Sequence, residues 1–308
     1  MLRAIIIVLA GLALLAKGAD VFVAGGSGFA VRRGLSPAVI GLTIMAYGTS
    51  LPELVVSLSA AAEGNAAIAL GNVLGSNIAN IALILAICML LRPEMIDTAI
   101  RPAIMRHALL MLAGTGIFAL LAVRGVLDAP AGAVLLAAFA AIFLALWSGR
   151  GEGSGGRIEA HGWKDVAYIV LGLAAVVVGS RLVLDGAVEL AETLGIPAFV
   201  IGMSMVAVGT SLPELATSLV AALSGEGGIS IGNIIGSNIF NLLLILGAGA
   251  IIHPIAIGSA ADVLAVCLFS VALLPLLIGS RIKVRVWSGI LIVSYFLYLA
   301  WLFLAAPV

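Results

Sequence analysis

Two glutamates within long apolar runs are the residues best placed to do chemistry in this chain. Glu53 and Glu214 each end a copy of the same segment, Gly-Thr-Ser-Leu-Pro-Glu, at residues 48–53 and 209–214. Within a lipid bilayer, a carboxylate at the centre of such a run costs roughly 2.5–3.5 kcal/mol or more, so it predicts a functional site. Hydroxyl side chains three and four residues earlier are expected to share a helix face with each glutamate. They belong to Thr49, Ser50, Thr210 and Ser211.

The same segment is expected to break a helix. Pro52 has no N–H, and its ring clashes with the carbonyl group four residues earlier, at Gly48. Glycine is itself a weak helix former. We therefore expect backbone carbonyls near Ala46 to be released as ligands, which a membrane protein tolerates where the backbone lines a site. The second copy predicts the same break at Gly209, Pro213 and Ala207.

A second repeated motif adds neutral oxygen atoms. The pattern Gly-Asn-x-x-Gly-Ser-Asn-Ile-x-Asn occupies residues 71–80 and 232–241. Its deeper positions are candidate ligands, namely Ser76, Asn80, Ser237 and Asn241. The remaining amides are expected to hydrogen-bond across helices, an interaction worth about 0.6 kcal/mol on average. They are Asn72, Asn77, Asn233 and Asn238.

The combined donor set consists of carboxylate, hydroxyl, amide and carbonyl oxygens. Ca²⁺ takes about 6–8 oxygen ligands in flexible geometry, and it suits a site with two formal negative charges. The same oxygens could hold Na⁺, or protons on the carboxylates. Soft transition metals would need imidazole or thiolate ligands instead. The sequence therefore predicts a site for a transported cation, with no resident cofactor.

Composition places these motifs in a membrane. Of the 308 residues, 63% are hydrophobic and 10% are charged, against about 45–50% and about 25% in soluble domains. This excludes a water-soluble globular enzyme. The formal net charge of zero argues against nucleic acid as a partner, and no obligatory protein partner is evident. The N-terminal apolar run continues through Gly11, Lys17 and Asp20, so we expect a membrane span there rather than a cleaved signal peptide.

The chain is internally repeated. Residues 34–87 align without a gap onto residues 195–248 at an offset of 161, and 28 of the 54 positions are identical. We expect an all-α polytopic protein with ten transmembrane helices, arranged as two five-helix repeats at residues 1–147 and 165–308. A Gly-rich linker, residues 148–164, joins them. An odd number of spans inverts the second repeat, as is typical of secondary transporters with a midplane site.

Charge predicts the orientation of the chain. If loops alternate sides, eleven Lys and Arg residues lie on one face and only Arg3 and Arg124 on the other. The positive-inside rule then places the linker in the cytoplasm and both termini outside the cell.

With both motifs present twice, the chain resembles the cation/calcium antiporter superfamily, and within it the prokaryotic sodium/calcium exchangers. The resemblance implies that Glu53 and Glu214 bind calcium together with backbone oxygens of Thr49 and Thr210. It implies sodium sites at Ala46, Ser50 and Ser237 and at Ser76, Ala207 and Ser211, with Asn80 and Asn241 at the centre. Some relatives have aspartate where this chain has Asn241, which disfavours potassium co-transport and removes one possible proton carrier.

The resemblance also implies a function. We expect a secondary antiporter, not an enzyme, that exchanges Ca²⁺ for Na⁺ across the inner or plasma membrane by alternating access. In such a mechanism the first and sixth spans slide against the remaining eight. Two alternatives remain: a Ca²⁺/H⁺ exchanger, and a cation channel, which could also use paired carboxylates and broken helices. The expected partners are Ca²⁺, Na⁺ and membrane lipid.

Overall fold

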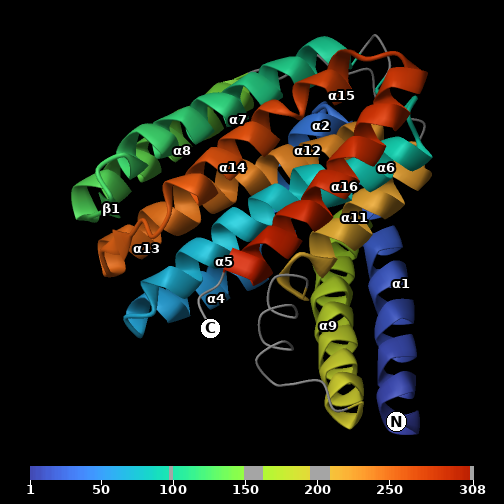
Figure 1. Cartoon of the computed structure of the whole chain (residues 1–308). Helices are drawn as coiled ribbons and strands as arrows, with labels where there is room; N and C mark the ends of the chain where they lie inside the picture. Colours follow the sequence, from blue (N-terminus) through green and yellow to red (C-terminus); the bar gives the residue numbers. More distant parts are fainter. Residues whose placement is uncertain (97–99, 149–161, 195–208, 306–308) are drawn as a thin grey trace.

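The structure is a computed structural model that describes residues 1–96, 100–148, 162–194 and 209–305. Helices account for almost all of these residues (Figure 1). The only strands in the described ranges are β1 (Val126–Leu127) and β2 (Ile255–Ala256), which pair antiparallel with Val126 opposite Ala256. The predicted all-helical class is therefore confirmed.

One span of the first half is broken: residues 37–49, made of three short segments, are followed at an angle by residues 51–62. In chain order the helices of this half are α1 (Leu2–Arg33), α2 (Pro37–Ile40), the π-helical turn η1 (Gly41–Met45), α3 (Ala46–Thr49), α4 (Leu51–Ala62), α5 (Ala66–Ala79), the π-helical turn η2 (Asn80–Leu85), α6 (Ala86–Leu91), α7 (Arg101–Ala122) and α8 (Ala129–Ser148).

The second half repeats this order where it is described. It contains α9 (Lys164–Thr193), α11 (Leu212–Leu223), α12 (Gly227–Ile239), the π-helical turn η3 (Phe240–Ile245), α13 (Leu246–Ile252), α14 (Ala260–Val271), α15 (Leu274–Ile278) and α16 (Arg281–Ala305).

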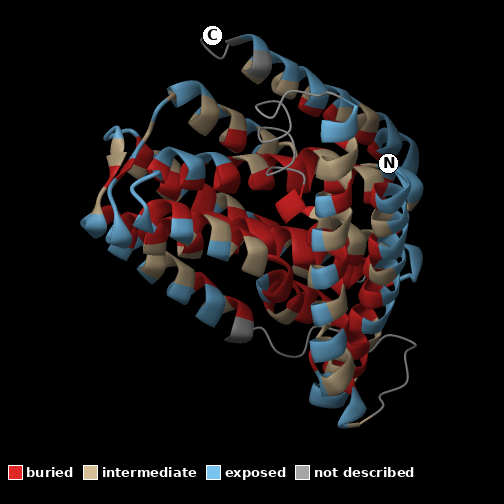
Figure 2. Cartoon of the chain, turned by 90° about the horizontal axis from the view of Figure 1, so that it is seen from below, coloured by how far each residue is buried: buried red, intermediate tan, exposed pale blue. Residues whose placement is uncertain are grey.

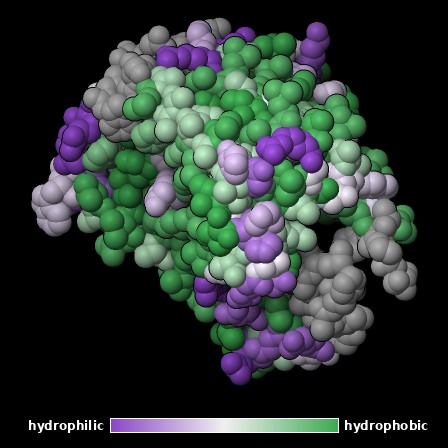
Figure 3. Space-filling model, turned by 90° about the vertical axis from the view of Figure 1, so that its left-hand side faces the viewer, coloured by the Kyte–Doolittle hydropathy of each residue, from purple (hydrophilic) through white to green (hydrophobic). Residues whose placement is uncertain are grey.

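The described helices supply eight membrane spans, or nine when the bent pair 37–49 and 51–62 counts as one. Helix α11 has 12 residues, and residues 195–208 before it lie outside the described ranges, as does most of the predicted linker. Hydrophobic side chains cover most of the face seen in Figure 3. A polytopic membrane protein is confirmed, while the count of ten spans stays a prediction.

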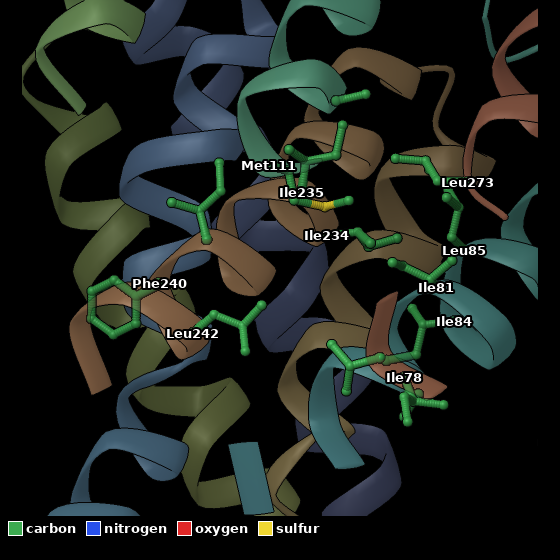
Figure 4. Close-up of a cluster of buried hydrophobic side chains, with 14 of the residues drawn as sticks. Ile78, Ile81, Ile84, Leu85, Met111, Ile234, Ile235, Phe240, Leu242 and Leu273 are labelled. Atoms are coloured by element: carbon green, nitrogen blue, oxygen red, sulfur yellow. The ribbon is translucent and has the colours of Figure 1, made fainter. Parts of the chain in front are cut away.

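Two spans form the centre of the molecule. In an 18-residue apolar window of the continuous stretch α5–η2–α6, 78% of the residues are buried, and the share is 83% for α12–η3–α13 and 22–39% for the other long spans. Buried residues accordingly gather in the middle of the bundle (Figure 2). Figure 4 shows Ile78 and Ile81 from one central span in the same cluster as Ile234 and Ile235 from the other. A helix enclosed by other helices is hydrophobic all round, and these two spans are so except for a few amides and hydroxyls, most of them in the second motif.

Helices α1 and α9 lie side by side at a steep angle to the other helices (Figure 1). Glycines let their backbones approach closely: a Cβ added at Gly18 would lie 2.7 Å from the nitrogen of Val176, and one added at Gly179 would lie 2.6 Å from that of Leu15. Each helix carries three such glycines at seven-residue spacing, which are Gly11, Gly18, Gly25, Gly172, Gly179 and Gly186. We call this contact the glycine seam.

An ion pair closes one end of the glycine seam. Asp165, in the first turn of α9, is fully buried, and its Oδ2 lies 4.0 Å from Nε of Arg32 in the last turn of α1. A Cβ at Gly28 would collide with the Asp165 carboxylate. A glycine at position 28 therefore makes room for a buried charge that ties the two helices together.

Candidate cation site

The helix break that the sequence predicts occurs at Ser50. The helices on either side of this residue, 37–49 and 51–62, meet at 48°. Ser50 leaves the helical conformation at φ −85° and ψ 8°, and Ser211 adopts nearly the same conformation (φ −89°, ψ 2°) just before α11. As a result Glu53 and Glu214 each lie in the first turn of a helix. The positive end of the helix dipole stabilises a carboxylate there.

The backbone carbonyl of Ala46 keeps its helical hydrogen bond, which the sequence predicted would be lost at the break. The carbonyl of Ala46 accepts a hydrogen bond from the N–H of Ser50 at 3.0 Å, and the Thr49 hydroxyl oxygen lies 3.4 Å from the same carbonyl oxygen. The chain bends and keeps this backbone bond, because the residue without an N–H is Pro52, two positions further on. The second predicted carbonyl, at Ala207, lies outside the described residues.

Both glutamate side chains are fully buried. The Ser50 hydroxyl donates to Oε1 of Glu214 at 2.9 Å, and the Ser237 hydroxyl lies 3.5 Å from the same oxygen. Ser50 is the N-cap residue of α4, and its carbonyl accepts a hydrogen bond from the N–H of Leu54 at 3.0 Å. Its hydroxyl nevertheless bonds to the carboxylate of the opposite half rather than to Glu53.

Several acceptor oxygens at this place remain unpaired in the described part of the chain. They include both carboxylate oxygens of Glu53 and Oε2 of Glu214. Both side-chain amide atoms of Asn241 also lack a partner. Buried acceptors without partners are costly unless something binds them. An oxygen-binding cation fits this donor set.

Two matching chains of hydrogen bonds frame the glutamates. Thr49 donates to Oδ1 of Asn233 at 3.2 Å, and the Asn233 amide donates to Ser218 at 2.9 Å. At an offset of 161, Thr210 donates to Oδ1 of Asn72 at 3.3 Å, and that amide donates to Ser57 at 2.9 Å. Each chain crosses from one half of the sequence to the other, so the halves together build one site.

The two central spans also bond directly to each other. The Asn77 amide donates to the carbonyl of Asn238 at 3.1 Å, and the Asn238 amide donates to the carbonyl of Asn77 at 3.3 Å. Asn80 donates to Oδ1 of Asn238 at 2.9 Å. The prediction that these amides hydrogen-bond across helices is confirmed, and Asn72 and Asn233 also accept hydrogen bonds beside the glutamates.

Two features of the site were missed by the reasoning from sequence. Ser57 and Ser218 orient the framing amides, and their signal is visible: each follows its glutamate by four residues and recurs at the repeat offset. The π-helical turns η2 and η3, which contain Asn80 and Asn241, have no such signal. Turns of this kind are frequent at functional sites.

Most of the predicted site residues are buried in this one region. Ser76 contacts Ser211, whose hydroxyl donates to it at 3.4 Å. The buried residues of the predicted set are Ala46, Thr49, Ser50, Glu53, Ser76, Asn80, Thr210, Ser211, Glu214, Ser237 and Asn241. Ala207 alone of that set is outside the described ranges.

A cavity of about 310 Å³ adjoins the site between α4 and α9. Its wall includes Pro52 and Thr210 from the first motif and Leu184 from α9. Thr210 also donates to Asn72 in the hydrogen-bonded frame. The cavity therefore reaches the residues next to the glutamates.

The fold and the site together define a helical membrane protein that holds two carboxylates in an oxygen-rich interior. The chain matches the model of the "Sodium/calcium exchanger protein" family over residues 3–148 and 164–305. It belongs to that family, whose members are ion-exchanging transporters rather than enzymes, and it is thus an antiporter of the cation/calcium class.

Three relatives illustrate the similarity. The chain is 39% identical over 273 residues to the putative antiporter CaxA of Alkalimonas amylolytica, covering 85% of this chain and 84% of the relative. It is 33% identical to the sodium/calcium exchanger MaX1 of Methanosarcina acetivorans, covering 94% and 95%. A structure of the sodium-calcium exchanger NCX_Mj soaked with Na⁺ and Ca²⁺ superposes with a TM-score of 0.86 at 31% identity, covering 97% and 98%.

Proposed function

We propose that this protein exchanges Ca²⁺ for Na⁺ across the cell membrane at the site around Glu53 and Glu214. One observation carries the proposal: two fully buried carboxylates from opposite halves of the chain, one bonded to Ser50 of the other half, lie among neutral oxygens. Two negative charges with hydroxyl, amide and carbonyl oxygens suit Ca²⁺. Na⁺ uses the same oxygens, so the two ions compete.

The ligands that we propose combine the two glutamates with the neutral oxygens beside them. The full set is Glu53, Glu214, Thr49, Thr210, Ser50, Ser211, Ala46, Ala207, Ser76, Ser237, Asn80 and Asn241. The similarity to NCX_Mj, whose structure was soaked with Na⁺ and Ca²⁺, supports this choice of substrates.

Electrostatics explain why such a site would exchange ions rather than leak them. With Ca²⁺ or Na⁺ bound, the two carboxylates are neutralised and the site can change the side from which it is accessible. Without a cation, two uncompensated charges would pass through a low-dielectric interior, which is prohibitive. The glycine seam joins α1 and α9 into one unit, which supports a mechanism in which these two helices slide together.

The paired hydrogen bonds support the proposed architecture of ten spans in two inverted repeats. Residues 1–147 form the first repeat, 148–164 the cytoplasmic linker and 165–308 the second repeat in this proposal. Bonds that recur at the offset of 161, and the reciprocal pair Asn77–Asn238, are what a twofold relation between the halves requires. Both termini would then lie outside the cytoplasm.

The test is an ion-flux experiment on the purified protein. Liposomes loaded with Na⁺ are diluted into Na⁺-free buffer, and uptake of radioactive Ca²⁺ is followed. Parallel samples are loaded with choline or carry a proton gradient. We expect uptake only where Na⁺ is inside, because its exit drives the entry of Ca²⁺.

The other outcomes separate the alternatives. Uptake driven only by the proton gradient would make the protein a Ca²⁺/H⁺ exchanger with the same site. Uptake into choline-loaded liposomes without any ion gradient would indicate a channel. Absence of Ca²⁺ movement in every sample would overturn Ca²⁺ as the substrate.

A further inference from the structure

Two adjoining cavities lie far from the glutamates, where α15 turns into α16. The first has a volume of about 380 Å³ and lies between that turn, the start of α7 and the loop before α7. The second, also about 380 Å³, shares Gly279 and Ser280 with the first. Both lie on the face that we predict as cytoplasmic. The side chains that matter for their chemistry are Arg101, Arg281, Lys283, Glu94 and Trp287.

The walls of these cavities carry an excess of positive charge. Arg101 and Arg281 line the first cavity and Lys283 lines the second, and none of the three forms an ion pair within the described residues. Among the described lining residues the one acid is Glu94, whose Oε1 lies 3.4 Å from Nε of Arg92. Nε of Arg101 is buried and has no hydrogen-bond partner in the described chain. A buried guanidinium N–H without an acceptor favours an anion.

On the opposite face, a cation next to α7 forms an ion pair. Arg124 follows α7 on that face, and its Nη2 lies 3.0 Å from the carboxylate of Asp128. Arg101, Arg281 and Lys283 have no such carboxylate partner among the described residues.

The residues around the two cavities are of the types found at the depth of the lipid head groups in a membrane. Ile278 and Ile282, on either side of the turn, are 62% and 77% exposed, as lipid-facing side chains would be. Trp287 lines the second cavity, and its indole N–H donates to the carbonyl of Ala272 at 2.8 Å. Tryptophan is enriched at membrane–water interfaces. The first N–H groups of the 25-residue helix α16 also point toward this end and favour an anion.

We propose that these cavities bind the head group of an anionic phospholipid from the adjacent leaflet. Its phosphate would be held by Arg101, Arg281 and Lys283, and its acyl chains would run along Ile278 and Ile282. Basic pockets between membrane helices are suited to such head groups. A lipid bound here would tie α16 to the start of α7, and the proposal does not depend on which ions the protein exchanges.

The test is a lipid titration of the purified full chain in a neutral detergent, followed by native mass spectrometry. Phosphatidylglycerol is compared with phosphatidylcholine of the same acyl chains, and we expect phosphatidylglycerol to bind at least about tenfold more tightly. Arg101→Gln, Arg281→Gln and Lys283→Gln should each weaken its binding about fivefold. Arg285→Gln is the matched control, since Arg285 is an exposed cation on α16 that lines neither cavity.

Three outcomes would overturn the proposal. The first is equal binding of the two lipids, and the second is a change of less than about twofold in all three cavity variants. The third is binding of free glycerol phosphate as tightly as phosphatidylglycerol, which would make this a site for a soluble anion.

A variant that does not fold is replaced by the substitution that keeps the charge, which is Arg→Lys at positions 101 and 281 and Lys→Arg at position 283. That substitution should retain phosphatidylglycerol binding, and loss of binding in a folded variant of this kind would count against charge as the cause. The location is checked independently in a variant that keeps Trp287 and has Phe at the other three tryptophans, Trp147, Trp163 and Trp301, where brominated phosphatidylglycerol should quench the remaining fluorescence.

Discussion

In the 18-residue apolar windows of the central spans α5–α6 and α12–α13, 78% and 83% of the residues are buried, against 28% and 22% in α1 and α9, which contact each other through glycines. In the centre, large apolar side chains interlock around a few hydrogen-bonded amides. In the α1–α9 pair, backbones approach without large side chains between them. Interlocked side chains oppose relative movement, while a tight pair with few such contacts to its surroundings can move as one body. This contrast supports our proposal that the centre binds the ions while α1 and α9 move as one unit.

The largest effect should come from removing a charge from the centre. Glu53→Gln or Glu214→Gln should reduce Na⁺-driven Ca²⁺ uptake in liposomes by at least about 100-fold, since loss of one buried carboxylate weakens Ca²⁺ binding by about 2.7 kcal/mol. Both variants should still insert into the membrane. Ser288→Ala, which removes a buried hydroxyl outside both motifs, is the control and should transport normally. Retained exchange in both glutamine variants would disprove the site.

The glycine seam is tested by adding one methyl group. In Gly172→Ala the new Cβ would collide with the backbone nitrogen of Phe22 on α1. We expect a loss of about 1–3 kcal/mol of stability from overpacking, measured as a lower midpoint of thermal unfolding in detergent. Gly289→Ala on α16, where nothing lies within 4 Å, is the matched control and should be neutral or slightly stabilising. Equal behaviour of the two variants would mean that the seam is not close-packed.

The reciprocal amides test whether the two halves contribute equally. Asn77→Ala should destabilise the protein by about 1 kcal/mol, because it leaves the carbonyl of Asn238 without its donor, and Asn238→Ala should cost more, because it also removes the acceptor of the Asn80 amide. The double variant should lose less than the sum, since the two bonds belong to one network. Thermal unfolding of the three variants measures this. Strict additivity would argue that the two bonds are independent.

The smallest effect concerns a position at which the two halves differ. Glu226 precedes α12 where Asn65 precedes α5, and burial raises the pKa of Glu226 above its ordinary value of 4.5. The folded state then binds the proton more tightly than the unfolded state. The free energy of unfolding falls as the pH rises from 4.5 through the folded-state pKa, and the full destabilisation is present above that pKa.

Glu226→Gln should therefore raise the unfolding midpoint at pH 7.5 by about 1–2 °C. The difference from the natural chain should shrink as the pH is lowered toward 4.5. Glu63→Gln, in the corresponding loop of the first half, replaces an exposed glutamate and serves as the control. An increase in the unfolding midpoint that is the same at every pH would exclude titration of Glu226 as its cause.

Much of the candidate site was predictable because the repeat states it twice. Proline and glycine at fixed distances from a glutamate predict a broken helix, since proline cannot donate the backbone bond that a continuous helix needs. Glu53 and Glu214 could be chosen because a charge within an apolar run is costly wherever the helices pack. These inferences depend on local covalent chemistry, and the structure places both glutamates in the first turn after the break.

The choice of partners was decided only by the tertiary structure. Local spacing pairs Ser50 with Glu53, yet the hydroxyl bonds to Glu214, 164 residues away, because the packing of the two halves brings that carboxylate within 2.9 Å of it. Likewise, the seven-residue glycine spacing was present in the sequence, but only the packing of α1 against α9 shows that these glycines form the close contact between the two helices. Composition and motif spacing by themselves determined the membrane setting, the internal repeat and the residue types of the site. Which oxygen meets which carboxylate depends on how separate helices cross, and no local pattern encodes that crossing.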